Sequence, residues 1–208
     1  MSGVLITFEG PDASGKTTQI RLLDEALRKK RIEPLLTREP GGTPIGEKIR
    51  ELLLDRESAE MVPMTEMLLY AAARAQHVEQ VIRPALANSR VVISDRFTDS
   101  SIAYQGYGRG LGDLVEKVNS AATGDLRPDL TFLLITAPES MRERMKEGRE
   151  DRIEAEKDDF HRTVLEGFLE IQRRDPARIV AVDGNLSIEE IAALISAKTM
   201  ELIGNRYG

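Results

Sequence analysis

A phosphate-binding loop follows a strand-like segment at the start of the chain. Residues 4–8 are mostly apolar, and residues 10–17 read Gly-Pro-Asp-Ala-Ser-Gly-Lys-Thr. In such a loop the glycines let successive backbone N–H groups face one anion, the lysine reaches the outer phosphates, and the threonine offers a hydroxyl to Mg²⁺. A helix predicted from Lys16 to Lys30 would point its positive end at the same phosphates. The chain is therefore predicted to bind a nucleoside triphosphate.

The loop and the first turn of its helix supply the predicted triphosphate contacts. A flexible turn that matches the pattern by accident is the alternative, and the strand before the loop and the helix after it disfavour that alternative. The residues predicted to bind the triphosphate are Gly10, Ala13, Ser14, Gly15, Lys16, Thr17 and Thr18.

Length and composition restrict the class of protein. The 208 residues contain no cysteine and no Gly/Ser/Pro-rich linker, which predicts one domain spanning 1–208 in the cytoplasm. We found no signal peptide and no apolar run near the roughly 20 residues that span a bilayer, so no membrane association is expected. A net charge of −6 argues against a broad nucleic-acid surface. The arginines that bind an anionic ligand must therefore be concentrated in a pocket.

Apolar strand-like runs alternate with amphipathic helical patterns. This alternation predicts an α/β fold in which a five-stranded, mostly parallel sheet carries helices on both faces and binds ligands at the carboxyl ends of its strands. A long helix is predicted over Met64–Ala87, with methionines that belong to the core or to a subunit interface. The predicted strands are Val4–Phe8, Glu33–Thr37, Val91–Ser94, Leu130–Ile135 and Ile179–Val182.

An acid and a base end the strand predicted at 91–94. Asp95 lies where a carboxylate from a second strand could hold Mg²⁺, directly or through water, and Arg96 adds a cation to the same crevice. The alternative is an ion pair that closes a strand end. A motor ATPase would follow this aspartate with glutamate, and a GTPase would carry an Asn-Lys-x-Asp run, which the chain lacks. The pattern favours phosphoryl transfer to a bound acceptor over transfer to water.

The run from Asp95 to Gln105 reads Asp-Arg-Phe-Thr-Asp-Ser-Ser-Ile-Ala-Tyr-Gln and resembles the thymidylate kinase family. Four other segments follow the order of that family: the phosphate loop, Thr37–Thr43, Leu69–Arg74 and Asp151–Glu154. Together they extend over most of the chain. The resemblance implies a P-loop nucleoside monophosphate kinase fold and ATP-dependent, Mg²⁺-assisted phosphorylation of deoxythymidine monophosphate (dTMP) to dTDP, which supplies dTTP. It also implies a homodimer.

The acceptor of this reaction needs no strong base. A phosphate monoester has a second pKa near 6, so its oxygen is already nucleophilic at neutral pH. Catalysis should then consist of alignment and charge neutralisation by Lys16, Asp95, Arg96 and lid arginines, with Thr17 and Asp95 as the metal ligands. His77 and His161 lie outside the motifs, and neither is assigned a role.

The resemblance also implies the acceptor site. Arg38 and Arg96 would grip the acceptor phosphate, since a guanidinium can donate two parallel hydrogen bonds. Tyr70 and Arg74 share a helix face, so the ring would stack on thymine while Arg74 donates to O4, where cytosine presents an amino group. A packed tyrosine beside a surface arginine is the alternative. The remaining predicted contacts are Asp12 at the sugar 3′-hydroxyl, Tyr104 beside the 2′ position, and Ser101 and Gln105 near the base or sugar.

A charged segment over about 142–155 is predicted to be a mobile lid. Ala13 stands where some members of the family carry an arginine aimed at the transferring phosphate, and members without it supply an arginine from the lid. Arg149 and Arg152 are the candidates, with Arg152, inside Asp-Arg-Ile-Glu, the better supported and also expected to contact ATP. Two other functions stay open: another nucleoside monophosphate kinase, and a nucleotide-binding switch without catalysis.

Overall fold

A computed structural model describes residues 3–136 and 151–207. Its sheet has the strand order β2-β3-β1-β4-β5, and all four neighbouring pairs are parallel. The predicted five-stranded sheet is therefore confirmed and is wholly parallel. The strands are β1 Val4–Glu9, β2 Leu35–Arg38, β3 Val91–Asp95, β4 Leu130–Ile135 and β5 Ile179–Asp183.

Helices fill the connections between the strands. The segment around 78–82 and the segment around 102–108 are wider π-helical turns, and the segment 56–58 is a short 3₁₀ turn. The elements are α1 Lys16–Lys29, α2 Pro44–Leu54, η1 Arg56–Ser58, α3 Pro63–His77, η2 Val78–Ile82, α4 Arg83–Ala87, α5 Thr98–Ser101, η3 Ile102–Gly108, α6 Leu114–Thr123, α8 Asp158–Arg174 and α9 Ile188–Tyr207.

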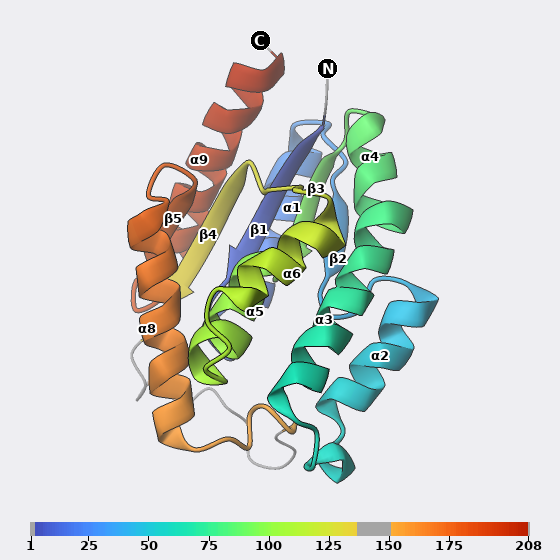
Figure 1. The fold of residues 1–208 in the computed structure, drawn as a ribbon. Coiled ribbons are helices and arrows are strands. Elements are labelled where there is room, and N and C mark those ends of the chain that lie inside the picture. Colours follow the sequence, from blue (N-terminus) through green and yellow to red (C-terminus); the bar gives the residue numbers. More distant parts are fainter. Residues whose placement is uncertain (1–2, 137–150, 208) are drawn as a thin grey trace.

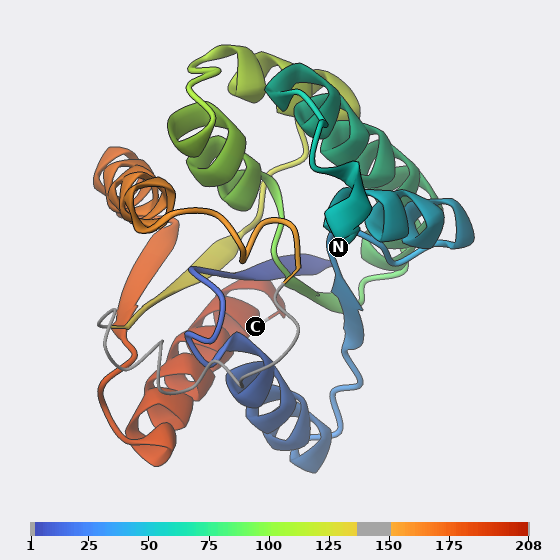
Figure 2. The same ribbon diagram turned by 90° about the horizontal axis from the view of Figure 1, so that it is seen from below.

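The sheet lies between two helical layers (Figures 1 and 2). Helices α1 and α9 cover one face, while α3, α4, α5, α6 and α8 lie on the other, with α2 outside α3. Strand β1 is buried along its whole length because side chains from both of its faces enter a core. On the α1 side the core includes Val4, Ile6, Phe8, Leu23, Leu27 and Ile195. On the other side Leu5 packs with residues such as Val78, Ile82 and Phe97.

The register brings the sequence motifs to one edge of the sheet. Phe8 lies opposite Asp95 in the β1–β3 pair, and Arg38 lies opposite Asp95 in the β2–β3 pair. Because the strands are parallel, the loops that leave them emerge at the same edge. The phosphate loop after β1, the Glu39 segment after β2 and Arg96 after β3 are therefore neighbours.

Two predicted elements were wrong by more than one terminal residue. Strand β2 begins at Leu35 and not at Glu33, because Pro34 has no N–H to donate to a ladder. The single helix predicted over Met64–Ala87 begins at Pro63 and contains the η2 turn, which lies just before Pro84. Proline leaves the carbonyl four residues earlier without its usual donor, which is compatible with a local widening of the helix.

The described helices include none that combines the length and the apolar character needed to cross a bilayer.

Candidate active site

The phosphate loop is built on backbone conformations that favour glycine. Gly10 and Gly15 have φ angles of 130° and 99°. A Cβ on Gly10 would also lie 2.3 Å from the carbonyl oxygen of Leu134, so a side chain is excluded there. Helix α1 starts directly after Gly15 with no acidic residue in its first turn, and its N-terminus therefore remains available to an anion.

Lys16 is held inside this loop. Its Nζ donates to the carbonyl oxygens of Gly10 at 3.0 Å and Pro11 at 2.8 Å, and the side chain is almost completely buried. Burial, together with the nearby Arg96 guanidinium, lowers the pKa of Lys16 to about 8. A bound phosphate would offset the free-energy cost of burying the Lys16 ammonium group by supplying the opposite charge.

Thr17 and Asp95 line the same cavity as Lys16. The Oδ1 atom of Asp95 is buried and has no hydrogen-bond partner among the described residues. A buried carboxylate oxygen without a donor is costly and suits a cation. Mg²⁺ keeps several waters and takes few protein ligands beside substrate phosphates, so one hydroxyl and one carboxylate fit it.

Arg96 bridges β3 and the phosphate loop. Its φ of 70° is left-handed and turns the chain directly after the strand. Its Nη1 donates to the carbonyl of Gly10 and to Ser100 Oγ, both at 2.9 Å, and its Nη2 lies 2.6 Å from Asp12 Oδ1. Burial opposes charge, yet the pKa of Asp12 is lowered because Arg96 and Lys16 lie beside it. Tyr104 donates to the other Asp12 oxygen at 3.2 Å.

A second cavity gathers the predicted acceptor contacts. Arg38 is the exception: it lines the phosphate-loop cavity, where it donates to Pro40 O and pairs with Glu47. Asp12, Glu39, Arg50 and Arg96 line both cavities, which therefore adjoin. The predicted residues in the second cavity are Asp12, Tyr70, Arg74, Arg96, Ser101, Tyr104 and Gln105.

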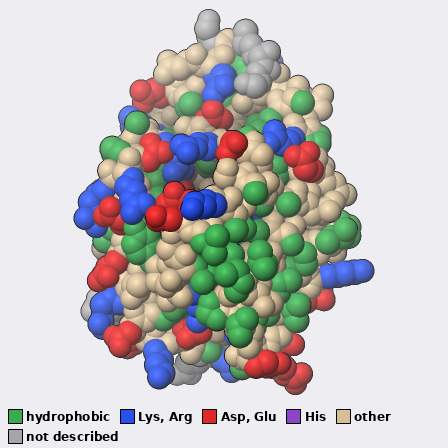
Figure 3. All heavy atoms as spheres, viewed as in Figure 1, with side chains coloured by type: hydrophobic (Ala, Val, Ile, Leu, Met, Phe, Trp, Pro, Cys, Tyr) green, Lys and Arg blue, Asp and Glu red, His purple; other side chains and the backbone are tan. Residues whose placement is uncertain are grey.

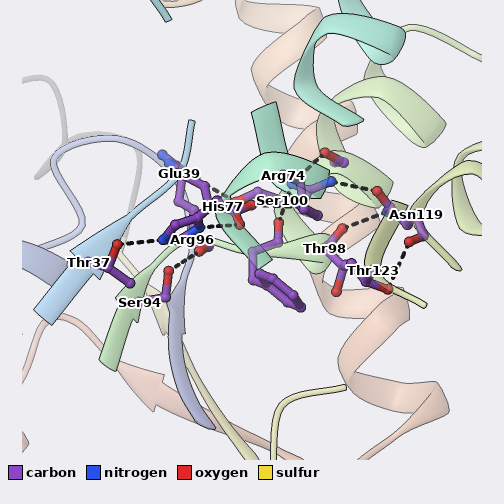
Figure 4. A network of polar contacts seen from close by, with 12 residues as sticks. Thr37, Glu39, Arg74, His77, Ser94, Arg96, Thr98, Ser100, Asn119 and Thr123 are labelled. Carbon is purple, nitrogen blue, oxygen red and sulfur yellow. Dashed lines mark hydrogen bonds and ion pairs between the residues drawn. The ribbon is translucent and has the colours of Figure 1, made fainter. Parts of the chain in front are cut away.

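Arg74 is buried at the end of this cavity, with 2% of its surface exposed. Its Nε donates to Glu39 at 2.7 Å, and its Nη2 donates to Phe97 O and Ser101 Oγ, both at 3.0 Å (Figure 4). Its Nη1 donates to Asn119 at 2.5 Å. The sequence predicted the helix face of Arg74 but not this set of acceptors, which comes from three other segments.

Arg152 is directed to a buried carboxylate in this structure. Its Nε donates to Leu53 O at 2.8 Å, and its Nη1 lies 2.7 Å from Glu66. Glu66 also accepts from Gln105 and Arg109. Arg152 is not among the residues that line the phosphate-loop cavity. The rest of the predicted lid, residues 142–150 with Arg149, lies outside the described residues.

Glu9 is a buried residue beside the site that the sequence analysis missed. It is fully buried at the end of β1, where it accepts from the backbone N–H of Phe97 at 2.7 Å and from the Ser100 hydroxyl. Burial, and then the neighbouring Asp99, raises the pKa of Glu9 to about 7. Its position directly before the phosphate loop is a signal that could have been used. Arg50, which lines both cavities, lay outside every motif.

Glu9→Gln is expected to flatten the pH dependence of stability. The folded protein holds a proton on Glu9 between the ordinary pKa of 4.5 and about 7, so wild-type stability should fall as pH rises through that window. Between pH 5 and pH 8 the free energy of unfolding of the wild type should fall by at most about 3 kcal/mol more than that of the variant. Urea unfolding of both proteins at the two pH values measures this. Equal pH dependence in both would contradict the prediction.

With this geometry in hand, the relatives of the chain can be compared. Residues 8–195 match the family model described as thymidylate kinase. The chain belongs to the thymidylate kinase family. The predicted family membership and enzyme class are therefore confirmed.

Individual thymidylate kinases align with this chain over nearly their full lengths. The enzyme of Exiguobacterium sp. (strain ATCC BAA-1283 / AT1b) is 51% identical over 97% of this chain and 96% of its own. That of Lactobacillus helveticus is 48% identical over 95% of each chain. The crystal structure of thymidylate kinase from Ehrlichia chaffeensis superposes with a TM-score of 0.76 at 32% identity, covering 97% of this chain and 99% of that one. The predicted kinase fold is thus confirmed.

Proposed function

We propose that the chain transfers the γ-phosphoryl group of ATP to dTMP and releases ADP and dTDP. The observation that carries this proposal is the pair of adjoining cavities, one around the phosphate loop and one around Tyr70 and Arg74, which share Asp12 and Arg96. Such an arrangement would allow an acceptor phosphate to lie beside the outer phosphate of a donor. Family membership supports the same reaction.

The chemistry rests on cations and not on a base. Among the described residues that line the two cavities there is no histidine, and the acceptor monoester needs none because it is already ionised. Lys16 stabilises the negative charge on the outer phosphates of ATP. Arg38, Arg50 and Arg96 surround the proposed position of the acceptor phosphate. Mg²⁺, when held by Thr17 and Asp95, supplies further neutralisation of the donor phosphates.

Arg74 reads the base in this proposal. Four of its five N–H donors are used within the protein, and one on Nη1 has no acceptor among the described residues. That donor suits thymine O4 and conflicts with the amino group of cytosine. Tyr70, one helical turn earlier, would stack on the same base. The compartment is proposed to be the cytoplasm, in keeping with a chain that contains no cysteine.

A panel of acceptors tests the function. MgATP with dTMP should give fast ADP release, and deoxyuridine monophosphate, which lacks one methyl group, should have a kcat/KM roughly 10- to 200-fold lower. Preference for deoxycytidine or adenosine monophosphate would indicate another monophosphate kinase. ADP release without any acceptor would indicate an ATPase or switch.

Arg74→Ala is expected to lower kcat/KM for dTMP by roughly 10- to 100-fold, because a charge-assisted hydrogen bond to the base is lost. The selectivity against deoxycytidine monophosphate should fall with it. The substitution also leaves the buried Glu39 without its ion-pair partner, at a cost of about 3 to 5 kcal/mol in stability. Arg74→Lys, which keeps the charge, should fold better and still lose selectivity. Unchanged selectivity in folded Arg74→Lys would contradict the assignment.

We also propose a homodimer through the outer face of α3 and α6. Figure 3 shows hydrophobic side chains gathered over these two helices. Met64 and Leu68 of α3 and Leu114 of α6 are 41%, 51% and 40% exposed. An apolar patch of this kind suits a self-association interface. Sedimentation equilibrium should give a dimer for the wild type and a monomer for Leu68→Glu; a monomeric wild type at micromolar concentration would contradict the proposal.

A further inference from the structure

A buried series of hydrogen bonds joins β2 to α3 beside the second cavity, the one that contains Tyr70 and Arg74 (Figure 4). His77, which is fully buried, lies at its centre. The Nε2 atom of His77 lies 2.6 Å from Thr37 Oγ1, and its Nδ1 lies 2.8 Å from Glu39 Oε1. The other carboxylate oxygen of Glu39 accepts from Arg74 Nε at 2.7 Å. Helix α3 therefore holds both oxygens of one carboxylate through two residues three apart.

The partners of His77 define its orientation. An ionised carboxylate can only accept, so Nδ1 must carry the proton that is shared with Glu39. In a neutral imidazole with its proton on Nδ1, Nε2 is the acceptor for the Thr37 hydroxyl. Gly42 packs against the same ring: a Cβ there would lie 2.7 Å from Cδ2 and Nε2 of His77. The loop after β2 therefore closes over the imidazole and leaves it little freedom to rotate.

Glu39 is the charged member among the acceptors of Arg74. The others are the Asn119 amide, the Phe97 carbonyl and the Ser101 hydroxyl. A guanidinium is planar, and the charge-assisted bond from its Nε to Glu39 is one of four hydrogen bonds that hold the plane in which the remaining Nη1 donor lies. A Glu39 carboxylate that could rotate would weaken the charged one of these four restraints.

We propose that His77 is a positioning residue for recognition of the nucleobase. It locks the Glu39 carboxylate, and Glu39 in turn orients Arg74 so that its remaining N–H meets the base. The proposal rests on the base-reading role proposed for Arg74. It assigns a specificity function to a histidine that lies outside the five family segments and lines neither of the two cavities.

Three variants separate positioning from simple packing. His77→Leu fills a similar volume but cannot donate to Glu39. In His77→Asn the amide nitrogen can occupy the place of Nδ1, so the donor to Glu39 is kept while the contact to Thr37 is lost. Thr37→Val leaves the bond between His77 and Glu39 intact and removes the hydroxyl from the other side of the ring.

Steady-state kinetics with dTMP, deoxycytidine monophosphate and ATP should distinguish these variants. His77→Leu is expected to raise KM for dTMP by roughly 10-fold and to narrow the ratio of kcat/KM between the two acceptors by a similar factor. KM for ATP should stay within about twofold of wild type, because His77 does not line the phosphate-loop cavity and its hydrogen bonds go to Thr37 and Glu39. His77→Asn should restore most of the selectivity, and Thr37→Val should retain it even where thermal stability falls.

Arg74→Lys is measured in the same series. If it abolishes selectivity while folded His77→Leu retains it, the positioning role of His77 is overturned and base reading by Arg74 stands. If Arg74→Lys retains selectivity, the base-reading role itself fails. Equal losses for dTMP and ATP in His77→Leu, with no rescue by His77→Asn, would reduce His77 to a packing residue and overturn the proposal.

Discussion

Arg149→Ala should lower kcat by roughly 10³- to 10⁵-fold, the range that arginine fingers contribute to phosphoryl transfer. The phosphate loop carries Ala13 and so supplies no arginine of its own to the transferring group. Arg152 is the other candidate, but it is bonded to Glu66 and Leu53 in this structure. Using it at the phosphate would require its side chain to move, because Arg152 does not line the phosphate-loop cavity.

The comparison with Arg152→Ala makes this prediction decisive. If Arg152 serves to hold Glu66, its removal should lower the thermal midpoint while kcat falls far less than in Arg149→Ala. Arg162→Ala is the matched control, because Arg162 lies on α8 with 68% of its side chain exposed and should change neither quantity. Single-turnover ADP formation at saturating dTMP measures the step directly. A large loss of kcat confined to Arg152→Ala would assign the catalytic cation to Arg152.

Lys16→Met should lower kcat by at least roughly 10²- to 10³-fold, the effect of removing one preorganised donor from a developing charge. The variant should still fold. The lowered pKa of Lys16 means that burial disfavours its charged ammonium group. An apolar side chain of similar length therefore avoids the cost of burying that charge.

Thermal unfolding provides the check on that interpretation. Lys16→Met should melt at or above the wild-type temperature, and Lys29→Met, at the exposed end of the same helix, should match wild type in both rate and stability. Near-normal turnover by Lys16→Met would contradict the assignment of this lysine to the transferring phosphate.

The motifs and the sheet were predictable from the sequence because both follow from the pattern of parallel, buried strands. Parallel strands buried on both faces are short apolar runs, and their carboxyl ends meet at one edge, so Lys16, Asp95 and Arg96 could be brought together before any coordinates were known. The errors arose where local chemistry competes with pattern. Pro34 delayed a strand, and a helix with continuous apolar periodicity contains a π turn before Pro84.

The buried polar contacts could not be predicted from the sequence. Glu9 bonds to Phe97 and Ser100 across 88 and 91 residues, and Glu39 meets Arg74 and His77 across 35 and 38. None of these pairs has a local spacing that would mark it. Such residues are also ambiguous singly, since a glutamate in an unplaced loop is normally exposed. Two positions offered a signal: that of Glu9, directly before the phosphate loop, and that of His77, three residues after Arg74 on one helix.

If Asp12 and Arg96 have the roles proposed above, the ion pair between them would make acceptor binding an exchange of hydrogen-bond partners. Before substrate arrives, the cation assigned to the acceptor phosphate is already neutralised at 2.6 Å by the carboxylate assigned to the sugar. In the proposed site, a 5′-phosphate that took over Arg96 would free Asp12 to accept from a 3′-hydroxyl. A nucleoside without a phosphate would leave the ion pair closed, so under these proposed roles one internal contact would make binding of the sugar depend on binding of the phosphate.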